Sequence, residues 1–163
     1  LANLPEIKLS YSLGGLSFIR TALKVANADF AIVVNDENFA DFQKYSLKKG
    51  QFGLYQHVDA THHLIENGIL VDMSVGMHVQ SLLDALPLKI NLELASWEVV
   101  ARFTEMSIGV GFFPDYIHAN ERFKDLKKLK TPTFDYEICA IYNKGEKLSR
   151  AAMAFLEQFT VAP

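Results

Sequence analysis

The residue types that most often carry catalysis are few in this sequence, and their spacing matches no common catalytic or metal-binding motif. The histidines do not form the spaced pair of a helical zinc site, and the adjacent pair is typical of a surface turn. They are His57, His62, His63, His78 and His118. Cys139 lies within the apolar run Ile138 to Ile141, so we expect a small buried side chain and not a nucleophile. We therefore expect no enzyme, no metal site and no cofactor.

The glycines near residue 110 fall short of a phosphate-binding motif. Gly109-Val110-Gly111 lacks the third glycine of a dinucleotide-binding turn and the lysine of a P-loop, and no G-x-S-x-G nucleophile elbow occurs. In a strand, such glycines permit close approach of a neighbouring element.

Four turns that precede expected helices offer backbone N–H groups to a ligand. They are Gly14 to Ser17, Met73 to Gly76, Ser96-Trp97 and Phe113 to Asp115. Unpaired amides and the positive end of the helix dipole suit an anion such as a carboxylate. Any one of these turns is more often only a helix cap, but four in one chain weaken that simpler interpretation.

The elements that position these turns alternate between strands and helices. A half-exposed strand over Glu6 to Leu13, a helix over 16–26 and a buried strand over 30–34 predict a βαβ unit with a right-handed crossover and a parallel sheet. Further strands are expected near residues 46–47, 52–55, 69–71, 88–94, 108–113 and 136–142, and further helices near 77–86, 97–104 and 148–159. The first two of these strands flank an expected turn, Lys48-Lys49-Gly50, and Ser96 is the expected N-cap of its helix. This alternation predicts an α/β fold with open sheets and ligand sites at the carboxyl ends of strands.

Composition narrows the class of protein further. The chain has 163 residues, of which 50% are hydrophobic, and a net charge of -3, which gives no electrostatic footprint for DNA. A single cysteine allows no internal disulfide, and no apolar run approaches the ~18 residues of a membrane span. The first residues lack the pattern of a secretory signal. We therefore expect a cytoplasmic location.

Three segments resemble one family in the same order along the chain. They are Ser96 to Pro114 (SWEVVARFTEMSIGVGFFP), Leu4 to Ile32, and Leu148 to Leu156 (LSRAAMAFL). All three resemble the effector-binding domain of LysR-type transcriptional regulators, so the resemblance runs almost from end to end.

The resemblance implies a two-lobed α/β domain like a type 2 periplasmic binding protein, with open, mostly parallel sheets, two crossing hinge strands and a small effector between the lobes. It implies a first lobe of residues 1–56 plus 137–163, without its usual first strand and helix, and a second lobe of residues 57–136. Turns of both lobes are then the expected effector-binding residues. They are Gly15, Leu16, Ser17, Met73, Ser74, Val75, Ser96, Trp97, Phe113 and Pro114.

The function that the resemblance implies is ligand sensing for a DNA-binding transcriptional regulator. A small metabolite, expected to be an anion, would act through the geometry of a homodimer formed by the helices near 16–26 and 148–160. DNA would be contacted only through a domain absent from this chain. The alternative is a solute-binding protein of a transport system. The residues do not select an aromatic acid, an amino acid or a sulfur compound as the ligand.

Overall fold

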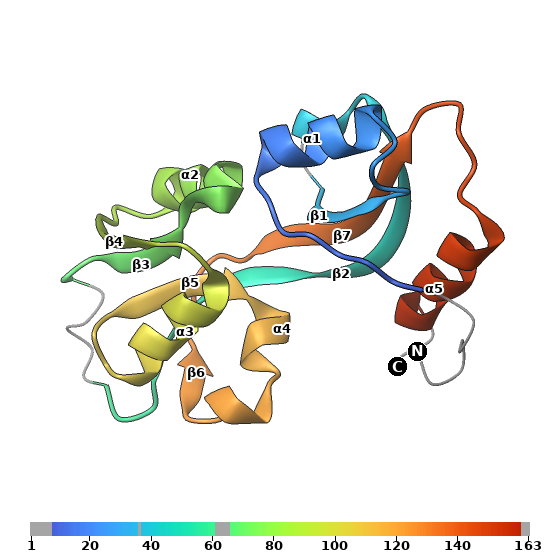
Figure 1. The fold of residues 1–163 in the computed structure, drawn as a ribbon. Coiled ribbons are helices and arrows are strands. Elements are labelled where there is room, and N and C mark those ends of the chain that lie inside the picture. Colours follow the sequence, from blue (N-terminus) through green and yellow to red (C-terminus); the bar gives the residue numbers. More distant parts are fainter. Residues whose placement is uncertain (1–7, 36, 61–65, 161–163) are drawn as a thin grey trace. The chain divides into compact units, whose positions relative to one another are not determined.

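A computed structural model describes residues 8–35, 37–60 and 66–160 and divides the chain into two compact units (Figure 1). Unit 1 comprises Leu1–Lys49 and Glu137–Pro163, and unit 2 comprises Gly50–Tyr136. Two strands, β2 (Phe42–His57) and β7 (Phe134–Asn143), contain residues of both units. The fold is mixed α/β, as the alternation of elements predicted.

Unit 1 is built from two helices and short strands. Its elements are α1 (Leu16–Lys24), β1 (Ala31–Val34), the 3-10 turn η1 (Glu37–Phe39), the first part of β2, the later part of β7, and α5 (Arg150–Thr160). The strand β1 pairs antiparallel with β7, which places Val33 opposite Cys139. Both side chains lie in a buried cluster with Leu23. Cys139 is therefore the buried small side chain that its apolar run predicted, and burial together with the charge of Glu137 raises its thiol pKa to about 11.

The predicted strand over residues 6–13 is wrong for its described part. Residues 8–13 form no strand, and Leu9, Tyr11 and Leu13 are 45%, 82% and 90% exposed. An alternating segment becomes a strand only where a neighbour completes its hydrogen bonds, and β1 pairs antiparallel with β7 instead. The expected parallel βαβ unit is therefore also wrong. Residues 6 and 7 lie outside the described residues.

The expected turn at Lys48-Lys49-Gly50 is also wrong, because β2 runs without a break from Phe42 to His57. Its second half is held by antiparallel pairing with β5 (Val110–Pro114) from Phe52 to Tyr55, and with β6 (Leu126–Lys128) from Tyr55 to His57. Two lysines and a glycine that locally favour a turn therefore lie within an extended strand.

Unit 2 contains three parallel strands, with helices in the connections between them. Along the chain it contains β3 (Ile69–Asp72), the 3-10 turn η3 (Met73–Val75), α2 (Gly76–Ala85), β4 (Ile90–Leu94), α3 (Trp97–Glu105), β5, α4 (Asp115–His118), the 3-10 turn η4 (Glu121–Phe123) and β6. The central strand β3 is parallel to both β4 and β5. The helix α3 packs on β3 and β5 through buried Val100 and Ala101, which lie in one cluster with Leu70 and Phe113.

Candidate functional site

One edge of the sheet in unit 2 collects three of the four turns that the sequence singled out. The parallel strands β3, β4 and β5 end at Asp72, Leu94 and Pro114. The register places Asp72 beside Leu94, and Leu70 beside Gly111. Because parallel strands end at a common edge, the turns that follow them lie at that edge. Met73 to Gly76, Ser96-Trp97 and Phe113 to Asp115 are therefore neighbours in space.

Two side chains cap the helical segments that begin at this edge. The Ser96 hydroxyl accepts a hydrogen bond from the Val99 N–H at 3.3 Å, which confirms Ser96 as the N-cap of α3. The carboxylate of Asp72 accepts from the Ser74 N–H at 2.8 Å and caps η3. Asp72 is not among the predicted site residues, although an aspartate directly after a buried strand and before a helix is an N-cap signal.

The predicted side chains at this edge differ in what they can reach. Met73 and Ser74 are exposed, whereas Ser96 and Trp97 are half-buried. Phe113 is fully buried, and its ring stacks on Tyr55 with the centroids 4.3 Å apart. Its side chain therefore belongs to the core of unit 2. Pro114 is buried at the end of β5, and Val75 lies in η3.

Four aromatic rings, one of them from the turn Ser96-Trp97, contact one another in a closed cycle. Phe52, Trp97, Tyr116 and Tyr136 follow one another with centroid distances of 5.7, 6.1, 6.1 and 5.2 Å, and each contact is edge to face. Burial, with the negative charge of Asp72, raises the pKa of Tyr116 to about 12. The Tyr136 hydroxyl donates to Asp115 at 2.6 Å. Only Trp97 of this cycle is among the predicted site residues. The other three rings come from β2, α4 and β7, which are distant from Trp97 in sequence.

The fourth predicted turn lies in unit 1, at the start of α1. Gly15 is the N-cap residue, no side chain caps the helix, and a Cβ at Gly15 would meet no atom within 4 Å. Leu16 and Ser17 form the exposed first turn. The first turn of α1 is therefore exposed and has no side-chain cap.

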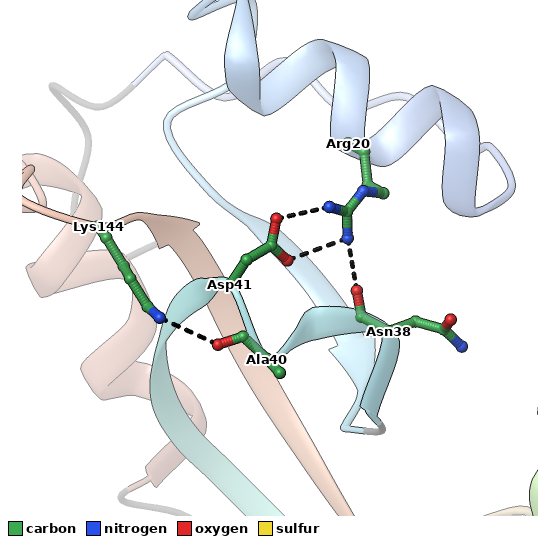
Figure 2. Close-up of polar contacts among 5 residues, drawn as sticks. All are labelled: Arg20, Asn38, Ala40, Asp41 and Lys144. Carbon is green, nitrogen blue, oxygen red and sulfur yellow. Dashed lines mark hydrogen bonds and ion pairs between the residues drawn. The ribbon is translucent and has the colours of Figure 1, made fainter.

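Arg20 of α1 makes polar contacts with the segment before β2 (Figure 2). The Arg20 guanidinium donates to the Asn38 carbonyl oxygen at 2.6 Å and to both carboxylate oxygens of Asp41. It also lies over the ring of Phe42, the first residue of β2. The Lys144 ammonium donates to the Ala40 carbonyl oxygen at 3.1 Å from the other side. Arg20 thus joins α1 to the segment that leads into β2, and Lys144 binds the same segment.

The histidines take part in structural contacts where they are described. The rings of His78 and His118 are bonded through Nε2 to the carbonyl oxygens of Asp135 and Leu126 at 3.2 and 3.0 Å. His62 and His63 lie outside the described residues. Within 8–35, 37–60 and 66–160 no group of three or more His, Cys, Asp and Glu side chains has the arrangement of a metal site. No helix in the same ranges has both the length and the apolarity to cross a bilayer.

Two α/β units that share two strands, with helix starts gathered at a sheet edge, define a class of ligand-binding domains. The chain belongs to the LysR substrate binding domain family, whose model matches residues 1–162. A comparison with curated proteins found no match.

Solved structures of regulators share this fold. The regulatory domain of CcmR from Synechocystis PCC6803, in complex with 2-PG, has a TM-score of 0.76 at 16% identity over 98% of this chain and 85% of that chain. The effector binding domain of QuiR, in complex with shikimate, has a TM-score of 0.70 at 16% identity over 98% and 82%. Full-length HypT from Salmonella typhimurium has a TM-score of 0.72 at 14% identity, over 98% of this chain and 61% of that chain. The match supports the regulator expectation over the transport alternative.

Proposed function

We propose that this chain is the ligand-sensing domain of a LysR-type regulator and binds a small metabolite with an anionic group at the carboxyl edge of the sheet in unit 2. The observation that carries the proposal is the convergence of three helix-start turns at the ends of β3, β4 and β5. CcmR with 2-PG, QuiR with shikimate and HypT with a bromide ion show small ligands in domains of the same fold.

The groups at this edge are suited to orienting a ligand and not to transforming it. Side chains already occupy the amides of Ser74 and Val99, so the preceding amides at each helix start are the donors that an anion would use. The exposed Ser74 hydroxyl and the half-buried Ser96 and Trp97 would add contacts. Gly15, Leu16 and Ser17 remain the predicted effector-binding residues of unit 1. We therefore propose a sensor without catalytic activity.

The output of such a sensor would be a change in a homodimer. Unit 1 exposes large apolar side chains on α1 and α5, namely Leu16, Phe18 and Phe159. Exposed apolar side chains on two helices are what a protein interface covers. The regulator would act in the cytoplasm and reach DNA through a domain outside this sequence.

A ligand screen by thermal melting tests the binding part of the proposal. Small carboxylates, amino acids, aromatic acids and inorganic anions are added separately, and a ligand at about 100 times its Kd should stabilise the fold by roughly 2.7 kcal/mol. Ser96→Ala should abolish the shift. Ser149→Ala is the matched control. Ser149 also caps a helix by accepting from the Ala152 N–H, but it precedes α5 in unit 1. Each variant should lose about 1 kcal/mol of stability, and only Ser96→Ala should lose binding. The absence of any saturable shift across the panel would argue against the proposal.

Sedimentation velocity tests the dimer. Phe18→Glu should convert the dimer into monomers, because it places a charge on the apolar face of α1. Met106→Glu is the control, since Met106 is 68% exposed but lies in unit 2. A wild-type chain that sediments as a monomer at high concentration, or equal dissociation in both variants, would contradict this interface.

A further inference from the structure

The aromatic cycle at the candidate site has the composition of a cation-binding site. Phe52 is fully buried and Tyr136 is 4% exposed, whereas Trp97 and Tyr116 are half-buried. The two half-buried rings lie 6.1 Å apart at an interplanar angle of 78°, so they present differently oriented faces. Aromatic faces at such angles attract ammonium groups through the ring quadrupole, and quaternary ammonium ions are recognised in this way.

Two carboxylates stand beside these rings. Asp72 is 7% exposed and lies close enough to Tyr116 for its charge to raise the pKa of that phenol. Asp115 accepts from the Tyr136 hydroxyl. Both carboxylates accept from neutral donors in these contacts. Asp72 accepts from the Ser74 N–H, and Asp115 accepts from the Tyr136 phenol. A buried negative charge held by neutral donors is stabilised further when a cation approaches. The electrostatics of the site therefore favour a positive group on the ligand.

A hydrogen-bond donor at the same place points to a ligand acceptor. The indole Nε1 of Trp97 is buried and has no hydrogen-bond partner in the part of the chain that the structure describes. A buried donor without a partner costs free energy, so an acceptor supplied by a ligand would stabilise this site. Trp97 is also the first residue of α3, where the amides favour negative charge. One residue thus offers a face for a cation and a donor for an anion.

We propose that the effector is a zwitterion, an α-amino acid or its N-methylated derivative. Its ammonium group contacts the faces of Trp97 and Tyr116 beside Asp72, and its carboxylate accepts from Trp97 Nε1 and the first amides of α3. This inference rests on the proposed function, because it names the class of ligand for the same site.

Matched pairs of ligands test the ammonium contact on the full chain. Each of several α-amino acids is compared with its deaminated carboxylate, and glycine betaine with 3,3-dimethylbutanoate, whose neutral tert-butyl group has the same shape as trimethylammonium. Titration calorimetry should show at least one zwitterion binding about tenfold or more tightly than the partner that lacks its positive charge, the size expected for a desolvated charged contact.

Variants assign the contact to residues. Asp72→Asn keeps an oxygen acceptor for the cap of η3 and should weaken zwitterion binding about tenfold, because it removes the negative charge beside the ammonium group. Asp84→Asn is the control, since Asp84 is an exposed carboxylate on α2 that bonds Gln80. Trp97→Phe keeps an aromatic face but removes the donor, so it should weaken binding of both members of a pair. If Asp72→Asn does not fold, Tyr116→Leu should weaken zwitterion binding where Tyr116→Phe does not.

The outcomes separate this inference from the proposed function. Equal or tighter binding of the deaminated members, or unchanged zwitterion binding by Asp72→Asn, would overturn the zwitterion and leave the sensor standing. Binding of other panel members but of no zwitterion would do the same. A full panel without any binding would overturn the sensor and the zwitterion together.

Discussion

The hydroxyl of Tyr136 donates a hydrogen bond of 2.6 Å to one carboxylate oxygen of Asp115, while the Gln51 N–H donates to the other at 3.0 Å. One carboxylate thereby joins the beginning of α4 to β7 and β2 within unit 2. Burial, the hydrogen bond and the charge of Asp115 hold the pKa of Tyr136 far above its ordinary value, so the phenol remains a donor.

Removing this hydroxyl should destabilise the protein without opening a large cavity. Tyr136→Phe leaves a buried ring in place but removes the donor, which should cost about 1–3 kcal/mol in the free energy of unfolding. Urea unfolding monitored by circular dichroism measures the loss. Tyr11→Phe is the control, because Tyr11 is 82% exposed and should tolerate the change. Equal stability of the two variants would show that the bond to Asp115 contributes nothing.

The ion pair between Arg20 and Asp41 should give unit 1 a pH-dependent stability. The hydrogen bond from Arg20 lowers the pKa of Asp41 below its ordinary value of 3.8. A carboxyl with a lowered folded-state pKa stabilises the fold above its unfolded pKa, and the contribution is lost as pH falls through the folded value. Asp41→Asn should therefore be less stable than the wild type near neutral pH, and the difference should shrink as the pH falls below about 4.

Urea midpoints of both proteins over a pH series measure this difference. Asp41→Asn in an Arg20→Ala background is the control, because the guanidinium that lowers the pKa is then absent and the difference should be small at every pH. A wild-type advantage that is the same at pH 3 and pH 7 would contradict the assignment.

Elements with a clear period of their own could be predicted from the sequence. The buried run Ile69 to Val71 forms β3, and the spacing around Val100 forms α3 behind the Ser96 cap. Ser149, which precedes the amphipathic C-terminal pattern, accepts from the Ala152 N–H at the start of α5. In each case the apolar period and a capping residue are adjacent in sequence, so local information decides the structure.

Features that depend on partners distant in sequence could not be predicted. Residues 8–13 alternate like a strand but form no strand, and β2 runs through a turn-like sequence as one strand of a larger sheet. The site divides in the same way. The turns at Ser74 and Ser96 follow from local pattern, whereas Tyr116 meets Trp97, and Tyr136 meets Tyr116, only in the folded protein.

The end of α1 contains a residue whose replacement should stabilise the protein. The helix ends at Lys24, and Ala26, two residues further on, has a left-handed backbone at φ 55°. An alanine in that region is strained, whereas glycine adopts it without a steric cost. Ala26→Gly should therefore raise the free energy of unfolding by about 0.5–1 kcal/mol, as measured by urea unfolding. Ala151→Gly, at an exposed position inside α5, should lower it by a similar amount. A loss of stability in both variants would show that Ala26 is not strained.

Close packing of α3 on β5 explains why residue 111 is a glycine. A Cβ there would lie 2.2 Å from Thr104 Oγ1, and Thr104 is fully buried with its hydroxyl bonded to the Val100 carbonyl oxygen. Gly111→Ala should therefore push the helix from the strand and cost about 1–3 kcal/mol, the range of an overpacked core. Gly109→Ala is the matched control, because its nearest neighbour would be a Leu70 methyl carbon at 3.2 Å.

The contact can be isolated by removing the threonine hydroxyl. In a Thr104→Ala background, Gly111→Ala should lower the free energy of unfolding by less than it does in the wild type, because Thr104 Oγ1 is no longer there to meet the new Cβ. The loss in the double variant should therefore be smaller than the sum of the losses in the two single variants. Urea unfolding of the two single variants and the double variant measures this coupling. If the costs are additive, or if Gly109→Ala is as damaging as Gly111→Ala, then the approach of Thr104 to β5 is not what requires the glycine.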